Sequence, residues 1–227
     1  MPRIYKLSKA GLKFLYKIRH HKGHGIHSPF VFNLVTKVIE EKTPYHAYED
    51  ISLVLEESHL NLFLKKKNKL FFRLVNYFSS RHILEIGSGN GVNTLCLTAP
   101  SSNIECTCVE TSEKKYEMAK ILYSKWERSI DLHTDGTLPY LNKKQDCILI
   151  NPLNYRQIPE NFIHYLSQLV HEKTFIIVTD IRTNKRNQAL WRGIMNMESR
   201  TAVLDLFNIG IVFFDKKLYR WKYRISF

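Results

Sequence analysis

Long apolar segments are missing from this 227-residue sequence. No run approaches the roughly 18–20 apolar residues that cross a bilayer, so a membrane-spanning helix is not expected. Cysteine is scarce, and the four cysteines form no Cys-x-x-Cys pair, so neither a disulfide framework nor a zinc site is indicated. A reducing cytoplasm is therefore the expected compartment. All four fall in predicted helices or strands, where they suit small apolar packing: Cys96, Cys106, Cys108 and Cys147.

Acidic residues are also few. The sequence has 34 Lys and Arg against 21 Asp and Glu, a net charge of +13, and no acid precedes Glu40. This excess favours an anionic neighbour such as nucleic acid, an acidic substrate or an anionic membrane surface. The acid-free start resembles an organellar transit peptide, but its evenly spread basic residues leave no apolar core of a signal peptide.

The composition that remains is that of a globular protein. Hydrophobic residues make up 44% and charged residues 24%, and aromatic residues, at 12%, are plentiful enough to build a core. The length suits one sizeable α/β domain with extra helices, or at most two small domains. The sequence contains no internal repeat and no low-complexity segment.

The first 80 residues read as helix alone. An amphipathic helix is predicted over residues 4–20, followed by a turn rich in Gly and His. Ser28 and Pro29 suit the N-cap and first position of a helix that runs to about Glu40. Two more helices are predicted at 47–59 and 69–79, preceded in the second case by a basic run. We therefore assign residues 1–80 to a helical N-terminal extension or lid.

The pattern changes at residue 82, where short β-type runs begin to alternate with helices. This alternation predicts a parallel sheet covered by helices on both faces, in a domain of residues 81–227. The last three runs are joined by short turns, which suits antiparallel strands. The expected strands are 82–86, 104–110, 130–133, 147–150, 175–178, 201–207, 209–214 and 219–226, and the intervening helices are 92–99, 112–126, 159–171 and 184–196.

A Gly-rich turn follows the first of these strands. Glu85-Ile86-Gly87-Ser88-Gly89-Asn90-Gly91 is an E-x-G-x-G-x-G sequence at a strand-to-helix crossing. Glycine permits unusual backbone dihedrals there and lets the chain approach a ligand closely. The start of the following helix offers free N–H groups to a carboxylate or phosphate. The turn is therefore suited to a ligand with a carboxylate or phosphate group, but taken alone it does not identify that ligand.

An acid stands where a ribose would need it. Glu110 ends the next strand, 19 residues after Gly91, and an acid at that place can accept both ribose hydroxyls. Nicotinamide enzymes use a similar pair. Three features argue against them: the spacing is GxGxG rather than GxGxxG, Glu85 precedes the first glycine, and the sheet is expected to end in antiparallel strands.

With these two elements the sequence resembles the class I S-adenosylmethionine-dependent methyltransferases, over about residues 80–215. Segment order resembles their catechol O-methyltransferase-like branch. The resemblance implies a Rossmann-like seven-stranded, mostly parallel sheet with an antiparallel C-terminal strand. It also implies that S-adenosylmethionine is the cofactor and that Asp135, in Thr134-Asp135-Gly136, faces adenine. The implied cofactor-binding residues are Glu85, Gly87, Ser88, Gly89, Gly91, Glu110, Asp135 and Asn151.

The residues at the ends of strands four and five, which determine the reaction in this branch, differ in this sequence. Its metal-dependent members place an Asp after strand four and an acidic pair after strand five, whereas here Asn151 and Thr179-Asp180 occupy these places. A hard cation prefers several carboxylates, so we expect no metal site. Asn151-Pro152-Leu153-Asn154-Tyr155 also resembles, in degenerate form, the Asn-Pro-Pro-Tyr of amine-methylating enzymes, which leaves amine methylation open.

Catalysis depends on orienting the acceptor and, for a hydroxyl acceptor, on removing its proton. We nominate Asn151, Asp180 and Tyr155 as catalytic candidates, with His24 and His27 as further candidate bases. Asp180 as a helix cap and Tyr155 as a packing residue are the structural alternatives. The expected function is methyl transfer to a small or modest-sized acceptor. An RNA or protein methyltransferase, favoured by the charge, and a catalytically silent cofactor-binding protein remain alternatives.

Overall fold

A computed structural model of the chain describes Gly11 and residues 28–227. Apart from Gly11, the helix predicted over residues 4–20 lies outside the described residues, as do the histidines before Ser28, including His24 and His27. The remaining predicted helices and strands are present, with ends shifted by a few residues. Their bounds are α2 (Pro29–Leu34), the π-helix η1 (Val35–Ile39), α3 (His46–Glu57), α4 (Lys66–Phe78), β1 (His82–Ile86), α5 (Val92–Thr98), β2 (Glu105–Val109), α6 (Glu113–Ser124), β3 (Ser129–His133), β4 (Cys147–Ile150), α7 (Phe162–Leu169), β5 (Phe175–Thr179), α8 (Lys185–Met195), β6 (Val203–Asp205), β7 (Ile209–Phe213) and β8 (Lys222–Arg224).

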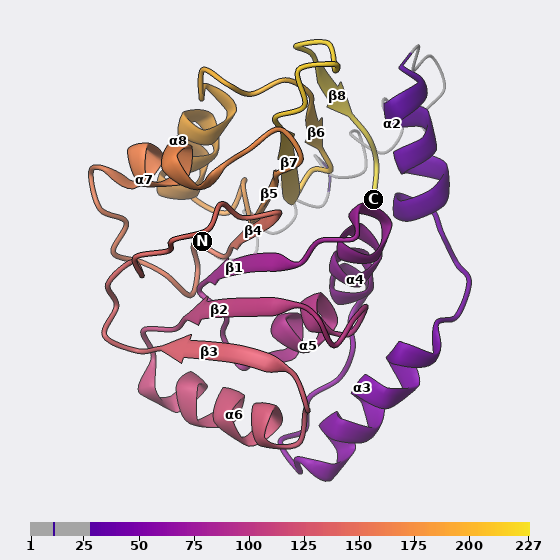
Figure 1. The fold of residues 1–227 in the computed structure, drawn as a ribbon, viewed down its shortest axis with the longest axis vertical. Coiled ribbons are helices and arrows are strands. Elements are labelled where there is room, and N and C mark those ends of the chain that lie inside the picture. Colours follow the sequence, from indigo (N-terminus) through magenta and orange to yellow (C-terminus); the bar gives the residue numbers. More distant parts are fainter. Residues whose placement is uncertain (1–10, 12–27) are drawn as a thin grey trace.

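The strands form one sheet in the order β3-β2-β1-β4-β5-β7-β6-β8 (Figure 1). The first five are parallel, and β7 inserts antiparallel between β5 and β6. The mostly parallel, Rossmann-like sheet expected from the sequence is thus confirmed. Two details differ: the described residues form eight strands rather than seven, and β8 joins β6 in parallel. The short turns before β7 and β8 suggested hairpins, but only the turn between β6 and β7 forms one.

Side chains alternate strictly between the two faces of the central strands, as a period of two requires. In β4, Cys147 and Leu149 enter the hydrophobic cluster on one face, while Ile148 and Ile150 enter the cluster on the other. All four are fully buried. The near-continuous apolar sequence of this strand therefore reflects helices on both faces of the sheet.

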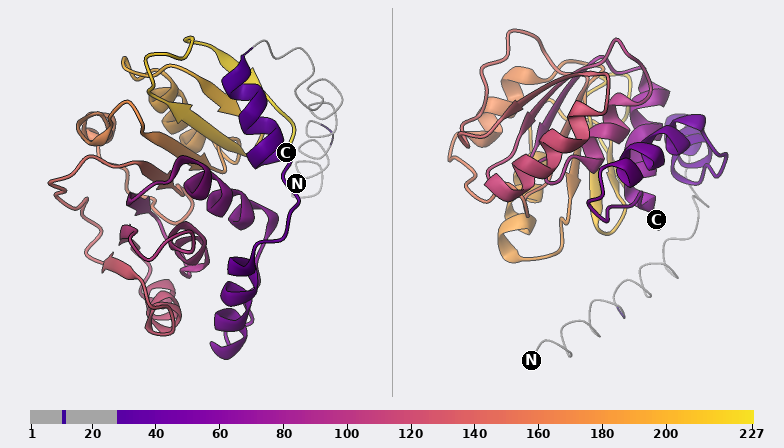
Figure 2. Two further views of the ribbon diagram at one scale, coloured as in Figure 1. Left: turned by 45° about the vertical axis from the view of Figure 1, so that its right-hand side comes forward. Right: turned by 90° about the horizontal axis from the view of Figure 1, so that it is seen from below.

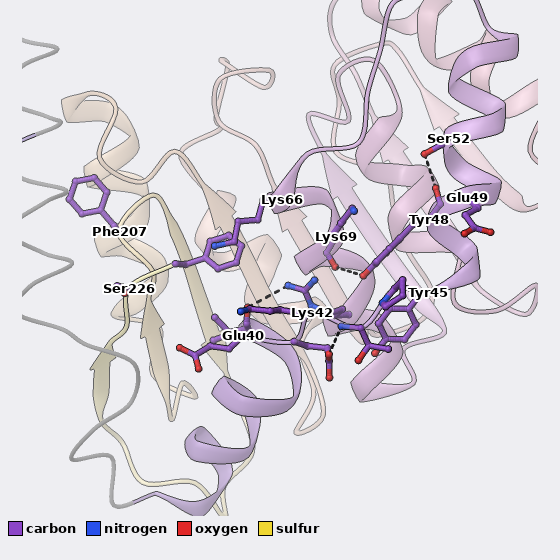
Figure 3. A pocket seen from close by; sticks show the side chains of 16 residues that line it. Glu40, Lys42, Tyr45, Tyr48, Glu49, Ser52, Lys66, Lys69, Phe207 and Ser226 are labelled. Atoms are coloured by element: carbon purple, nitrogen blue, oxygen red, sulfur yellow. Dashed lines mark hydrogen bonds between the residues drawn. The ribbon is translucent and has the colours of Figure 1, made fainter.

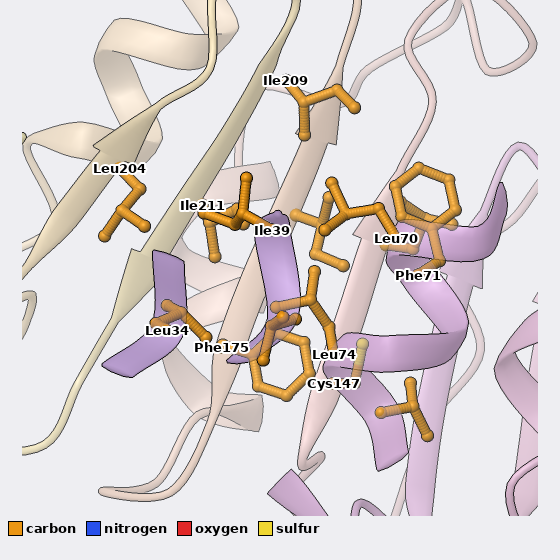
Figure 4. Close-up of a cluster of buried hydrophobic side chains, with 14 of the residues drawn as sticks. Leu34, Ile39, Leu70, Phe71, Leu74, Cys147, Phe175, Leu204, Ile209 and Ile211 are labelled. Carbon is orange, nitrogen blue, oxygen red and sulfur yellow. The ribbon is translucent and has the colours of Figure 1, made fainter. Parts of the chain in front are cut away.

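The N-terminal helices α2, η1 and α4 cover one face, and α7 and α8 cover the other (Figure 2). Leu70 and Leu74 of α4 pack with Ile39 of η1 and with Phe175 of β5 (Figure 4). The start of α2 is capped as predicted, since the Ser28 hydroxyl accepts from the backbone N–H two residues after Pro29. This packing fixes the start of α4 above the carboxyl ends of the parallel strands.

A third cluster joins α3 to α4, α5 and α6. Tyr45, Tyr48 and Phe72 form a group of edge-on rings, with centroids 4.9–5.4 Å apart. Arg73 is buried beside them, and its Nε donates to the carbonyl oxygen of Val38 at 2.6 Å. Among the described residues, none of the helices has the length and apolar character needed to span a membrane.

Candidate functional site

The predicted site residues meet at the carboxyl edge of the parallel strands. Beyond the end of β1, the Gly87 amide donates to the carbonyl oxygen of Val109 at 2.8 Å. On the other side, the Asn151 amide donates to the carbonyl oxygen of Ile86, also at 2.8 Å. These bonds continue the sheet pairing past the strand ends, so Gly87, Asn151 and the residue after Val109, Glu110, lie at one edge.

The glycine turn needs glycine at all three positions. The φ angles of Gly87, Gly89 and Gly91 are 82°, 68° and 88°, a region that side-chain-bearing residues rarely adopt. Space is short as well: a Cβ on Gly87 would lie 2.6 Å from the backbone oxygen of Asn151, and one on Gly91 would lie 2.9 Å from the Tyr123 ring. Gly91 therefore serves the packing of α5 on α6, while Gly87 and Gly89 face the loop after β4.

Glu110 is fully buried and holds the turn from below. Its Oε2 accepts from the amide of Gly89 at 2.6 Å, and its Oε1 accepts from the amide of Ser112 at 2.8 Å. Both are charge-assisted bonds to backbone donors, the stronger class of hydrogen bond. The carboxylate that the sequence assigns to the ribose thus already ties the glycine turn to the start of α6.

Glu85, the acid before the first glycine, points under the turn. Its Oε2 accepts from the Thr94 hydroxyl at 2.6 Å, while its Oε1 is buried without a hydrogen-bond partner among the described residues. Burial raises the pKa of this carboxyl to about 7, although the Thr94 hydrogen bond opposes the shift. Glu85 therefore joins β1 to α5 beneath the turn and does not line the cavity above it.

A cavity of about 600 Å³ opens over the glycine turn. Its walls come from the start of α4, the first turn of α6 and the ends of β4 and β5. A volume of this size suits a cofactor or small ligand. Ser88 lines it, and its hydroxyl is buried without a hydrogen-bond partner in the described part of the chain. The other lining residues are Asn61, Leu62, Phe63, Lys65, Lys67, Asn68, Gly89, Asn90, Val92, Asn93, Ser112, Lys114, Lys115, Met118, Asn151, Leu153, Asn154 and Asp180.

Asn154 lies directly against the glycine turn. Its Nδ2 donates to the carbonyl oxygen of Gly87 at 3.0 Å, and its Oδ1 accepts from Lys115 Nζ at 2.7 Å. A Cβ placed on Gly89 would be only 2.6 Å from Asn154 Nδ2. The hydroxyl of Thr111 also donates to the Asn154 carbonyl oxygen, at 3.1 Å. The loop after β4 is therefore fastened over the turn and over the strand end that carries the ribose acid.

Four of the predicted site residues line this cavity: Ser88, Gly89, Asn151 and Asp180. Asp180 follows β5 with φ of 54°, an uncommon backbone conformation that is often found at functional sites. It is not the helix cap suggested as its structural alternative, because Asn184 caps α8 by accepting from the Asn187 amide. Its cavity position thus keeps Asp180 available to a ligand.

Tyr155 and Asp135 do not line this cavity. Tyr155 is 1% exposed, packs among the core residues of the second face, and donates its hydroxyl to the Gly136 carbonyl oxygen at 2.9 Å. This placement favours its packing interpretation. Asp135 is exposed and accepts from both the amide and the hydroxyl of Thr137, which lower the pKa of its carboxyl. Its polar contacts stay within its own turn.

No group of three or more His, Cys, Asp and Glu side chains with metal-binding geometry occurs among the residues that the structure describes. Arg182, two residues after Asp180, does not line the cavity. Its guanidinium pairs instead with the buried Asp205, through hydrogen bonds of 2.7 and 2.6 Å. The absence of a metal requirement stays a prediction.

Sequence reasoning missed several cavity residues. Asn154 could have been predicted from the sequence, because it lies three residues after Asn151 in a strand-end motif. The pair of Asn68 and Asn93 could not have been predicted, because their 2.7 Å hydrogen bond joins α4 to α5 across 25 residues of sequence. Lys115, on the first turn of α6, had no motif to identify it.

The chemistry of this donor set fits S-adenosylmethionine. Gly87 and Gly89 present bare backbone, Glu110 offers a carboxylate for hydroxyl groups, and Ser88 has a hydroxyl with no partner among the described residues. One contact stands in the way, since the side chain of Asn154 lies where a ligand would approach the turn. The residues therefore fit the cofactor once the loop of Asn154 moves off the turn.

A second, larger cavity of about 910 Å³ lies on the other side of the start of α4. Side chains of α3 and α4 meet across it, and the Tyr48 hydroxyl donates to the Lys69 carbonyl oxygen at 3.5 Å (Figure 3). Its charged residues are of both signs: Lys42, Lys66, Lys69 and Arg73 against Glu40, Glu41 and Glu49.

Comparison with known proteins identifies the fold. No protein-family model matches the chain, and no curated protein sequence matches it. Among solved structures, an O-methyltransferase from Bacillus cereus in complex with S-adenosylhomocysteine is similar with a TM-score of 0.51 at 20% identity, over 81% of this chain and 97% of that one. A methyltransferase from Podospora anserina, also bound to S-adenosylhomocysteine, gives 0.54 at 13% identity, over 83% and 97%.

An O-methyltransferase of tomaymycin synthesis from Streptomyces achromogenes, in complex with S-adenosylmethionine, is similar with a TM-score of 0.51 at 14% identity, over 79% of this chain and 94% of that one. The chain spans nearly the whole of each of these proteins. With its strand order and its antiparallel β7, the chain therefore has the fold of the class I O-methyltransferases.

Proposed function

We propose that this chain is an S-adenosylmethionine-dependent methyltransferase that acts on a small or modest-sized acceptor without a catalytic metal. One observation carries the proposal. The glycine turn and the buried carboxylate of Glu110 are joined by a 2.6 Å hydrogen bond beneath a cavity at the carboxyl edge of the sheet. Ligands of open α/β sheets bind at this edge. The similar solved structures, which hold S-adenosylmethionine or S-adenosylhomocysteine, support the same ligand.

The residues around the turn would hold the cofactor. Gly87 and Gly89 let a ligand approach the backbone, Ser88 offers its hydroxyl, and Glu110 would accept the ribose hydroxyls. When bound, the cofactor supplies an electrophilic methyl group on a sulfonium. Glu85 stabilises the turn from below and takes no part in the reaction.

The acceptor end of the site would be formed by Asn151 and Asp180. Both line the cavity, from the ends of the neighbouring strands β4 and β5. Asp180 is the only carboxylate among the described lining residues, so we assign it the role of the general base that removes the proton of a hydroxyl acceptor. Asn151 is buried and would orient the acceptor, because methyl transfer is an in-line displacement whose rate depends on alignment.

The N-terminal extension would complete the site. Lys65, Lys67 and Asn68, at the start of α4, line the same cavity as the glycine turn. This supports the assignment of residues 1–80 as an extension that covers a methyltransferase domain of residues 81–227.

The proposal is tested by calorimetric titration of S-adenosylhomocysteine into the purified chain and its Glu110→Ala and Glu110→Gln variants. We expect binding by the unaltered chain and a loss of tenfold or more in both variants, because a hydrogen bond to a charged group contributes about 1.5–3 kcal/mol. Glu113→Ala, an exposed acid on the first turn of α6, is the matched control and should leave affinity unchanged.

Circular dichroism and thermal unfolding show whether the variants stay folded, which matters because Glu110 also bonds two backbone amides. A folded chain that binds neither S-adenosylmethionine nor S-adenosylhomocysteine would overturn the proposal. So would binding that the Glu110 variants leave intact. Transfer of a labelled methyl group to an acceptor then separates an enzyme from a catalytically silent binding protein.

A further inference from the structure

The cavity over the glycine turn carries an unbalanced positive charge. Four lysines line it, and Asp180 is the only acid among its described lining residues. None of these lysines forms an ion pair with a carboxylate of the described chain, and Lys115 donates instead to the amide oxygen of Asn154. The lysines are Lys65, Lys67, Lys114 and Lys115.

The neighbouring cavity provides an internal comparison. It lies on the other side of the same helix start and is lined by four cations and three acids. Figure 3 shows Lys42, Lys66 and Lys69 among them. Two of its lysines lie over aromatic rings, as Lys65 does in the first cavity, so the balance of charge and not the ring contact distinguishes the two cavities. The excess of positive charge is thus a feature of the proposed cofactor cavity and not of every surface hollow in this basic protein.

The lysines of α4 stand where helices disfavour them. Lys65 is the N-cap residue and Lys67 lies in the first turn, which contains no acid. The N-terminus of a helix carries a partial positive charge, so each cation there costs about 0.3–1 kcal/mol. A local rule broken at a cavity points to a functional reason for the charge. An anionic ligand would offset this cost.

An aromatic ring stands beside these lysines. Phe63 lines the cavity and 66% of it is exposed, so its ring is accessible to a ligand. Lys65 Nζ lies 5.1 Å from the centre of its ring. An exposed ring next to cations is the arrangement that binds a planar group by stacking and its anionic substituent by charge.

We propose that the methyl acceptor is a small planar aromatic compound that carries a phosphate group. Its ring stacks on Phe63, and its phosphate lies between Lys65 and Lys67. A phosphate dianion neutralises more of the positive charge of the four lysines than a single carboxylate would. This inference rests on the proposed function, which it narrows by naming the acceptor class. Lys114 and Lys115 strengthen the positive field from the opposite wall.

The test is calorimetric titration of phenyl phosphate into the full chain, alone and saturated with S-adenosylhomocysteine. Inorganic phosphate and benzyl alcohol serve as the probes that lack the ring and the charge. We expect phenyl phosphate to bind at least tenfold more tightly than either. Lys65→Met and Lys67→Met should each weaken it fivefold or more, and added salt should weaken it in the unaltered chain. Phe63→Ala should weaken phenyl phosphate binding and leave the binding of inorganic phosphate unchanged.

Lys69→Met is the matched control, because Lys69 belongs to the same helix but lines the other cavity. It should change the affinity for phenyl phosphate less than twofold. Equal effects of all three lysine variants, or no binding of phenyl phosphate, would overturn the inference. An affinity for single-stranded oligonucleotides that greatly exceeds that for phenyl phosphate and grows with their length would also overturn it, in favour of a nucleic-acid acceptor.

The failures can be told apart. If S-adenosylhomocysteine binds and phenyl phosphate does not, the acceptor class is wrong and the proposed function stands. If phenyl phosphate binds with the expected dependence on Phe63, Lys65 and Lys67 while S-adenosylhomocysteine does not bind, the anion site stands without the methyl donor.

Discussion

The side-chain amide of Asn154 donates to the carbonyl oxygen of Gly87 over 3.0 Å and so fastens the loop after β4 to the glycine turn. Lys115 holds the same amide from the other side, through a 2.7 Å bond to its Oδ1. A ligand that lies against the turn must break these contacts. The proposed cofactor site therefore has to open before it fills, and the side chain of Asn154 sets part of that cost.

We expect Asn154→Ala to bind S-adenosylhomocysteine more tightly than the unaltered chain. Each hydrogen bond of this kind contributes about 0.5–1.5 kcal/mol net, so the gain should be about three- to tenfold in the dissociation constant. Calorimetric titration measures it. Asn103→Ala, in an exposed loop after α5, is the control and should have no effect. Weaker binding by Asn154→Ala would show that Asn154 holds the cofactor rather than covers its site.

Gly87→Ala should lose cofactor binding. The φ of 82° already disfavours a side chain, by roughly 1–2 kcal/mol, and the new Cβ would lie 2.6 Å from the backbone oxygen of Asn151, which cannot rotate away. The strand end would have to shift, and with it the proposed acceptor residue. We expect a lowered melting temperature and no detectable binding of S-adenosylhomocysteine. Gly136→Ala is the comparison, because its φ is also positive, at 74°, but its nearest neighbour would be 3.5 Å away. A Gly87→Ala chain that binds as well as Gly136→Ala would contradict the assignment of this turn.

The sequence was informative where chemistry is local. Glycine in a turn after a strand predicts a backbone with positive φ, and the φ angles of Gly87 and Gly89 confirm it. Short β-type runs that alternate with helical patterns located β1 to β5, and the central strands β4 and β5 are apolar throughout because helices cover both of their faces. The antiparallel place of β7 could also be expected, from the short turns at the end of the chain.

Contacts between segments that are distant in the sequence could not be predicted from local patterns. Nothing in the pattern of residues 219–226 distinguishes a hairpin strand from β8, which pairs in parallel with β6. The bond between Asn68 and Asn93, like that between Lys115 and Asn154, depends on the tertiary arrangement. The same holds for Tyr155, whose place in a strand-end motif suggested catalysis while its hydroxyl is engaged in the core.

Arg182 should matter for stability. Its guanidinium makes two bonds to Asp205, whose side chain is completely buried. Although burial is the largest influence on the pKa of Asp205 and raises it, the hydrogen bond and charge of Arg182 help to lower it overall. Removing Arg182 leaves a buried carboxylate with less compensation, so Arg182→Ala should cost about 3 kcal/mol in the free energy of unfolding. Arg182→Lys should recover only part of this, because lysine cannot form the paired bonds.

Urea unfolding near neutral pH measures these differences. Arg192→Ala, on the exposed side of α8, is the control and should change the free energy of unfolding by less than about 0.5 kcal/mol. An Arg182→Ala variant as stable as this control would show that Lys222, whose Nζ lies 3.4 Å from the Asp205 carboxylate, and the Phe207 amide stabilise the buried charge of Asp205 without Arg182.

Glu85 should make stability fall as pH rises through the weakly acidic range. Burial raises the pKa of its carboxyl from an ordinary 4.5 to about 7 in the folded chain. Between these values the folded state binds more protons than the unfolded state, so the free energy of unfolding decreases with pH. Below pH 4.5 the contribution is fully present, and above about pH 7 it is lost. The whole change is on the order of 3 kcal/mol, since one pKa unit corresponds to about 1.4 kcal/mol.

Glu85→Gln removes this titration and keeps an oxygen that can accept from the Thr94 hydroxyl. We expect the variant to gain stability relative to the unaltered chain as pH rises from 4.5 to 7.5, with little difference at the acidic end. Urea unfolding at several pH values follows the difference, and Glu113→Gln, an exposed acid, should show none of it. A Glu85→Gln curve that runs parallel to that of the unaltered chain across this range would mean that Glu85 is ionised in the folded protein. The turn would then rest on a buried negative charge at Glu85 in addition to the carboxylate of Glu110.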